Sequence, residues 1–115
     1  MKDIKLAKFI AKKAAEKKAE DIVILHIGEY LNITSYFVIC SGNNKKQVKA
    51  ISDDIQEKLA KKKIKSFSRE GETEAEWILL DYGDVIIHVF DDEVRKYYNL
   101  ERLWKNVPHI NIEGI

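Results

Sequence analysis

The sequence predicts an α/β fold of the α+β type, a single-domain mixed β-sheet of about five strands flanked by helices. Two observations predict it. Five segments rich in Val, Ile, Phe and Trp have the length of strands, and other segments carry apolar residues at helical spacing. The 115 residues, 45% apolar and 34% charged, show no linker and no repeat, so we expect one domain over 1–115.

Residues 3–19 are predicted to form the first helix, and Asp3 can cap its start. Its apolar side chains form one stripe, with lysines over the remaining surface, and the stripe is best explained by packing on a sheet. The stripe consists of Leu6, Phe9, Ile10 and Ala14. Two strongly apolar segments follow, 21–27 and 35–40, and each is predicted to be a strand.

A second helix is predicted from about Lys45 to Lys61. Its apolar residues recur at spacings of three, four and four, at Val48, Ile51, Ile55 and Leu59. Asn43 or Asn44 can cap its start, because a side-chain oxygen there accepts from free amides of the first turn. A shorter third strand is expected at 64–69.

Residues 76–90 are predicted to form a β-hairpin. A two-residue loop at Tyr82-Gly83 would pair Leu80 with Val85, Ile78 with Ile87 and Trp77 with His88. Neither strand alternates cleanly between apolar and polar residues, so we expect both faces to be covered and the hairpin to lie inside the sheet. Its tip would carry carboxylates and a tyrosine into solvent.

A short helix is predicted after the hairpin, capped by Asp91 or Asp92 and running through Tyr98. Residues 100–104 continue or restart it, and Pro108 marks its end. The tail 109–115 is short and partly apolar, so its pattern is ambiguous between strand and coil.

Composition favours a cytoplasmic protein. Cys40 is the one cysteine, and no apolar run approaches the length of a membrane span. Charge is unevenly distributed, with seven lysines in residues 1–20 and nine acidic residues but no Lys or Arg in residues 70–93. Such asymmetry suits the binding of phosphate at the basic end and of a basic protein at the acidic end. The alternative is that each end is simply a solvated charged surface.

The sequence offers no convincing catalytic, cofactor or metal site. Histidine and cysteine occur at none of the usual ligand spacings, so His26, His88 and Cys40 are best explained as buried residues. The loop before the second helix lacks a phosphate-binding glycine pattern. A two-metal enzyme needs acids at alternating positions on one strand, whereas Asp81 and Asp84 flank a turn.

A protein-binding surface fits the remaining residues better than an RNA-binding module does. The chain lacks the aromatic pair and the glycine loop of common RNA-binding folds. It does have many large aromatic residues near acids, which is typical of interfaces, although core packing can explain about half of them. These aromatics are Trp77, Tyr82, Tyr97, Tyr98 and Trp104.

Several blocks of the sequence resemble the ribosomal silencing factors, the RsfS or Iojap-like family. The most specific is the string from Glu76 to Phe90, which contains Trp77, the run Leu79-Leu80-Asp81-Tyr82-Gly83-Asp84, His88 and Phe90 in the family's order. Further matching blocks are Ser35–Gly42, Gln47–Ile51, Glu70-Gly71 and Arg95–Trp104. The resemblance covers roughly 4–106 and leaves 107–115 as a C-terminal tail.

The resemblance implies a nucleotidyltransferase-like topology without the catalytic acids, and a non-enzymatic factor without cofactor. It implies binding to the large ribosomal subunit through the fourteenth ribosomal protein of that subunit, which sterically blocks subunit joining and represses translation when nutrients are limiting. The implied docking residues are Trp77, Leu79, Asp81, Tyr82, Gly83, Asp84 and Val85. Family members are often homodimers when free.

The chain departs from the family pattern at two positions, where His26 and Ser35 replace acids that the family commonly has. The basic first helix is expected to add a peripheral, salt-sensitive contact with ribosomal RNA. Two alternative functions stay open from the sequence, a metal-dependent nucleotidyltransferase-like enzyme and an RNA-binding module.

Overall fold

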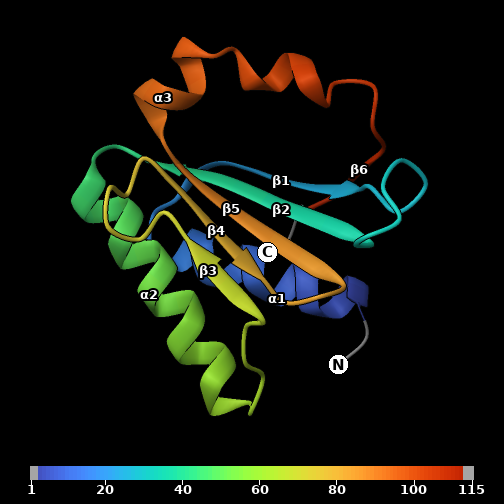
Figure 1. The fold of residues 1–115 in the computed structure, drawn as a ribbon, viewed down its shortest axis with the longest axis horizontal. Helices are drawn as coiled ribbons and strands as arrows, with labels where there is room; N and C mark the ends of the chain where they lie inside the picture. The colour runs from blue at the N-terminus through green and yellow to red at the C-terminus, as the bar shows by residue number, and fades with distance from the viewer. Residues whose placement is uncertain (1–2, 113–115) are drawn as a thin grey trace.

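A six-stranded mixed sheet forms the centre of the molecule, in the order β3-β4-β5-β2-β1-β6 (Figure 1). The computed structural model describes residues 3–112. Its strands are β1 Glu20–His26, β2 Tyr36–Gly42, β3 Ser68–Glu70, β4 Trp77–Asp81, β5 Val85–Asp91 and β6 His109–Ile110. Its helices are α1 Asp3–Glu16, α2 Lys45–Lys61 and α3 Asp92–Tyr97, followed by a 3₁₀ turn, η1 Leu100–Leu103.

The predicted fold class is confirmed, with six strands where about five were expected. β2 and β5 are parallel, and all other neighbouring strands are antiparallel. The missed strand is β6, which lies in the ambiguous tail and pairs Ile110 with Ile24 and His109 with Leu25. Two paired residues are too few to produce a strand pattern in a sequence.

The two faces of the sheet are covered very differently. Side chains alternate along each strand, so Val85, Ile87 and Val89 of β5 point into the main core beneath α1 and α2. The opposite side of β5 carries Ile86, His88 and Phe90. There a smaller cluster lies under the arm formed by α3 and η1, consisting of Leu25, Ile27, Ile39, Phe90 and Val107. Coverage of both faces was expected for the hairpin, but the second face is only partly covered.

The hairpin forms as predicted, but its register is shifted by two residues. Leu80 pairs with Ile87 and Ile78 with Val89, and the Tyr82 amide donates to the Val85 carbonyl at 3.0 Å. The loop is therefore Gly83-Asp84. Gly83 has φ +84°, and its amide donates to Asp81 Oδ1 at 2.8 Å, which stabilises the later turn. Because side chains alternate with a period of two, the shift leaves every strand residue on the predicted face. The expectation that the tip carries a tyrosine into solvent is wrong, since Tyr82 leaves the loop and is buried in the main core at 7% exposed.

The helices follow the sequence closely. α2 has the predicted bounds, and Asn44 caps it by accepting from the Gln47 amide at 2.8 Å. Asp91 caps α3 by accepting from the Glu93 amide at 3.0 Å. The first helix ends at Glu16 rather than at residue 19, and Asp3 lies in its first turn instead of preceding it. The third strand is only Ser68–Glu70, shorter than the expected 64–69.

The backbone at Gly71 requires glycine. Its φ is +81°, and a Cβ built there would lie 2.0 Å from the Trp77 carbonyl oxygen. We expect Gly71→Ala to lower the free energy of unfolding by about 2 kcal/mol or more, because the clash adds to the strain of a left-handed conformation. Urea unfolding measures this loss.

Gly28→Ala is the matched control. A Cβ at Gly28 would meet no heavy atom closer than 3.5 Å. Its effect should stay within about 0.5 kcal/mol, as at an ordinary surface position. A loss of equal size in both variants would show that the close approach at Gly71 has no special cost.

Candidate functional site

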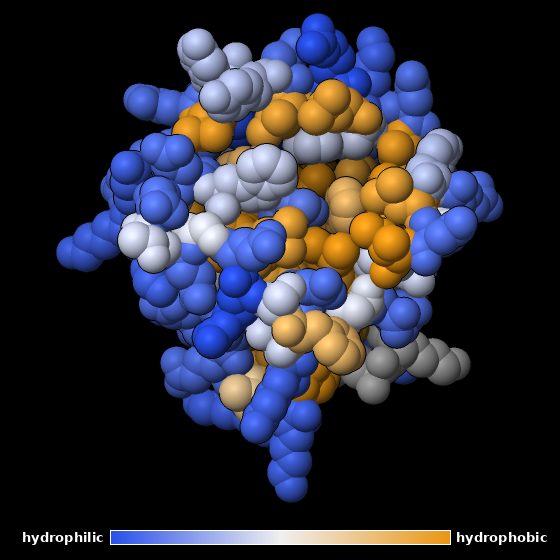
Figure 2. Space-filling model, viewed as in Figure 1, coloured by the Kyte–Doolittle hydropathy of each residue, from blue (hydrophilic) through white to orange (hydrophobic). Residues whose placement is uncertain are grey.

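The candidate site is the part of the sheet's second face that the α3–η1 arm leaves uncovered. We call it the open face and define it by Phe37, Trp77, Leu79, Asp81, Ile86 and His88, of which Ile86 and His88 are each only 8% exposed. Strand pairing brings these residues together, since Ile86 lies between Phe37 and Asp81, while His88 lies opposite Leu79. Figure 2 shows hydrophobic side chains gathered below the arm on the viewed side of the molecule. Trp77 is 49% exposed at the edge of this region.

An apolar pocket of about 390 Å³ lies between the open face and the arm. The sheet contributes its floor, the arm forms one wall, and the loop between β1 and β2 contributes Tyr30 and Leu31. The lining residues are Leu25, Ile27, Tyr30, Leu31, Phe37, Ile39, Trp77, His88, Phe90, Leu100, Leu103, Trp104 and Val107. Deep apolar pockets of this kind take large apolar side chains or uncharged small molecules.

His88 is the one polar side chain of this lining that is buried, at 8% exposed. Trp77 Nε1–H donates to His88 Nδ1 at 3.0 Å, so the neutral ring carries its proton on Nε2. That Nε2 is buried and has no hydrogen-bond partner among the described residues. Burial lowers the pKa of His88 from 6.5 to about 4, which keeps the ring neutral near pH 7. The expectation of a buried histidine is confirmed for His88, whereas His26 is only half-buried and stacks on Tyr36 with ring centres 5.0 Å apart.

A buried guanidinium holds the arm in place. Arg95, on α3, is 3% exposed and donates to Ser41 Oγ on β2 at 2.8 Å. It also donates to the Glu101 carboxylate of η1, and its guanidinium lies 5.8 Å from the Trp104 ring centre. One side chain therefore joins α3, the sheet and η1, and it fixes the wall of the apolar pocket.

The structure divides the predicted docking residues into three groups. Trp77, Leu79 and Asp81 lie together on the open face. Gly83 and Asp84 form the adjoining turn, where Asp84 is exposed. Tyr82 and Val85 lie elsewhere, since they are 7% and 0% exposed and pack in the main core on the helix side. These two can support the turn but cannot themselves contact a partner.

Sequence reasoning missed several exposed apolar residues beside the open face. The loop between β1 and β2 exposes Tyr30, Leu31 and Ile33, the last of them 72% exposed, and η1 exposes Leu103 at 68%. The sequence does contain a signal for these loop residues, because large apolar residues inside a loop between two predicted strands are candidates for a binding surface. Phe37 and Ile86 gave no signal, because strand residues on a covered and an uncovered face look alike in the sequence.

In the described part of the chain we find neither an activated thiol nor a group of metal-ligating side chains. Cys40 is completely buried, and burial raises the pKa of its thiol to about 12, far from that of a nucleophile. Among residues 3–112 no three His, Cys, Asp or Glu side chains are grouped so as to hold a metal ion. In the same residues, no helix has the length and hydropathy needed to cross a membrane.

An α/β domain with an exposed tryptophan, an apolar pocket and carboxylates at the edge has features typical of protein-binding domains. Comparison with known proteins gives the family. The family model described as "Ribosomal silencing factor during starvation" matches residues 1–115. The chain therefore belongs to the ribosomal silencing factors, a family of non-catalytic ribosome-binding proteins, and the resemblance seen in the sequence is confirmed.

Similar proteins come from several bacteria. The chain is 40% identical over 108 residues to ribosomal silencing factor RsfS of Bacillus subtilis, covering 94% of this chain and 92% of that protein. It is 41% identical over 100 residues to RsfS of Halalkalibacterium halodurans, covering 87% and 86%. A crystal structure of a Chromobacterium violaceum protein matches with a TM-score of 0.86 and 30% identity, covering 91% of this chain and 88% of that chain.

The buried His88 predicts a pH-dependent stability. As the pH falls through 6.5 the unfolded chain binds a proton at His88, whereas the folded chain resists protonation until about pH 4, so stability decreases across this window. His88→Asn keeps an acceptor for Trp77 and cannot titrate. Between about pH 7 and about pH 4.5, the wild type should lose about 2 kcal/mol more than this variant.

Urea unfolding of both proteins at each pH measures the difference. Carboxylates also titrate near pH 4.5, but they do so in both proteins, so their contribution cancels. Equal losses in the two proteins would contradict a His88 that stays neutral in the folded state.

Proposed function

We propose that this ribosomal silencing factor binds the large ribosomal subunit with its open face, docking on the fourteenth ribosomal protein of that subunit. The observation that carries the proposal is the exposure of Trp77 beside a 390 Å³ apolar pocket that the α3–η1 arm lines on one side only. Aromatic anchors next to a desolvated pocket supply most of the energy in typical interfaces.

Acidic groups surround the apolar part of this face. Asp81 and Asp84 lie at the hairpin tip, and the exposed Glu70 of β3 pairs with Leu79 at the edge of the sheet. Carboxylates at the rim speed association with a basic partner and are screened by salt, while apolar burial sets the lifetime of the complex. The proposed partner surface is therefore basic at its edge and apolar at its centre.

Docking on the inter-subunit side would block joining of the small subunit by steric exclusion. This mechanism needs no chemical step, which agrees with a non-catalytic family. Under the proposal the protein represses translation in the cytoplasm when nutrients are limiting. Its sheet has a nucleotidyltransferase-like topology but not the paired acids of nucleotidyltransferases. In this protein the sheet would serve as a binding scaffold.

Two further contacts belong to the proposal. A free molecule would cover its apolar face by pairing with a second copy as a homodimer, which dissociates on the ribosome. The basic side of α1, which includes the exposed Lys5, Lys8 and Lys12, would make a peripheral contact with ribosomal RNA.

The docking face can be tested with Leu79→Lys combined with Asp84→Lys. The first change puts a charge on the apolar surface, and the second reverses an exposed charge at the tip. We expect at least about a tenfold loss of affinity for purified large subunits, because an anchor region and a steering charge are both lost. Co-sedimentation measures binding, and circular dichroism checks the fold.

The matched control is Ala50→Lys with Asp53→Lys. Both residues are exposed on α2, on the opposite side of the sheet, and the change in net charge is the same. This control should bind as the wild type does. Full binding by a folded docking-face variant would overturn the proposed face, and equal loss in both would point to net charge alone.

The α1 contact can be tested with Lys8→Ala combined with Lys12→Ala. If the lysines meet ribosomal RNA, the slope of log affinity for large subunits against log salt should fall by about 1 to 2. The same titration with the wild type gives the reference slope. An unchanged slope would remove α1 from the interface.

A further inference from the structure

A second surface adjoins the hairpin tip and has a different chemistry. Residues 61–69 contain four lysines and one arginine, and no acidic residue. They also contain Phe67, whose side chain is 80% exposed. The segment connects the end of α2 to β3, at the edge of the sheet. An exposed ring inside a basic segment is the combination that single-stranded nucleic-acid sites use, a stacking platform beside cations.

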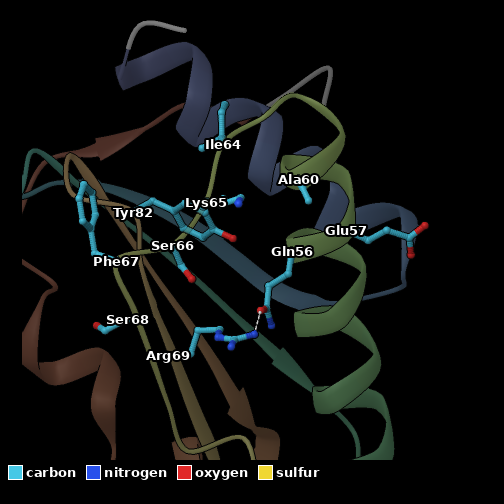
Figure 3. Close-up of a pocket in the computed structure, with 10 residues that line it drawn as sticks. All are labelled: Gln56, Glu57, Ala60, Ile64, Lys65, Ser66, Phe67, Ser68, Arg69 and Tyr82. Carbon is cyan, nitrogen blue, oxygen red and sulfur yellow. Dashed lines mark hydrogen bonds between the residues drawn. The ribbon is translucent and has the colours of Figure 1, made fainter.

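The segment and α2 enclose a broad hollow of about 750 Å³ (Figure 3). Gln56, Glu57 and Ala60 line it from α2, and residues 64–69 line it from the other side, together with Tyr82. Figure 3 shows Arg69 reaching across to Gln56, to which it donates at 3.0 Å. The hollow is open and mostly polar, which suits an extended charged ligand better than a compact apolar one.

The Phe67 ring has a fixed place beside the hairpin tip. The Phe67 amide donates to the Asp81 carbonyl at 2.7 Å, which ties this residue to the end of β4. The ring then lies over Gly83, where an added Cβ would come within 2.9 Å of Phe67 Cε2. One side of the ring is therefore held by the turn, and the rest faces solvent. A planar group with this support can stack on a base with little loss of side-chain entropy.

The positive charges of the segment are only partly compensated. Lys61 pairs with Glu57 at 3.5 Å, and Arg69 lies 3.8 Å from Glu72. Lys62, Lys63 and Lys65 form no ion pair with a carboxylate of the described residues, and Lys62 lies 4.9 Å from the ring centre of Phe9 instead. Lys65 lines the same hollow as the exposed Phe67, and Lys62 and Lys63 precede it in the same segment, so the segment as a whole favours polyanions.

We infer that residues 61–69 form a binding surface for single-stranded or loop RNA, in which a base stacks on Phe67 while Lys63 and Lys65 contact the flanking phosphates. An acidic protein segment would use the cations but would leave the planar ring without a matching partner, so RNA fits better. The inference rests on the proposed function, because the RNA would be ribosomal RNA beside the docking site of the open face.

The inference is tested on the full chain with a fluorescent single-stranded RNA of about twelve nucleotides, by anisotropy at several salt concentrations. Phe67→Ala should weaken RNA binding about tenfold, as expected for the loss of one stacked base. Lys63→Ala with Lys65→Ala should lower the slope of log affinity against log salt by about 1.4. Phe67→Tyr keeps the stacking surface and should restore wild-type affinity.

The matched control is Lys17→Ala with Lys18→Ala, which removes the same charge at exposed positions beyond the end of α1. Gln47 Nε2 donates to the carbonyl oxygens of both residues, at 3.4 and 3.1 Å, so they lie near the start of α2, about 25 Å from its end. This control should bind RNA as the wild type does. Equal binding by wild type and Phe67→Ala would overturn the inference, and so would tighter binding of a poly-glutamate peptide than of RNA.

The RNA measurement is independent of docking on the ribosomal protein. Leu79→Lys with Asp84→Lys tests the open face with whole subunits, whereas the Phe67 variants are measured on RNA alone. Full binding of large subunits by the folded Leu79→Lys, Asp84→Lys variant, with weaker RNA binding by Phe67→Ala, would overturn the proposed function only. Loss of subunit binding by that variant, with no effect of Phe67→Ala on RNA binding, would overturn this inference only.

Discussion

The parallel pairing of β5 with β2, with β4 on the other side of β5, is the constraint on which the rest of the structure depends. It keeps β5 inside the sheet, and the alternation of side chains then gives its two sides different functions. Val85, Ile87 and Val89 enter the core beneath the long helices. Ile86, His88 and Phe90 go to the side that only a short arm covers. The open face therefore exists for two reasons. β5 lies inside the sheet, and the helices cover one side of the sheet more completely than the other.

The sequence predicted the fold well where periodicity or capping was clear, as in α2 and its cap Asn44. It failed where the outcome depended on the side-chain hydrogen bond of a particular turn or on pairing between distant strands. The hairpin register depends on the later turn that Asp81 and Gly83 form, and β6 exists only because β1 offers a free edge. Within the predicted docking site, Trp77, Leu79 and Asp81 share a face. Tyr82 could not be placed from sequence, because the direction of a turn residue depends on the actual register.

The open face has the features of an interface more than of a small-molecule enzyme. Its polar groups are used to position its apolar ones, since His88 orients the Trp77 ring and Arg95 fixes the wall of the pocket. At the hairpin tip an acidic turn adjoins the basic segment with Phe67. Two chemically different surfaces thus lie next to each other, and they match the two kinds of partner proposed above, basic protein and RNA.

The role of Arg95 has a consequence for the dynamics of the C-terminal region. The guanidinium joins three chain segments, while β6 is held by only two paired residues. Local opening of residues 92–112 would have to break the Arg95–Ser41 hydrogen bond and the β6 pairing together, so we expect this part of the chain to open as one unit at a lower free energy than the central strands. Each opening would also expose the apolar pocket from the side, so local unfolding and the availability of the binding pocket are thermodynamically linked.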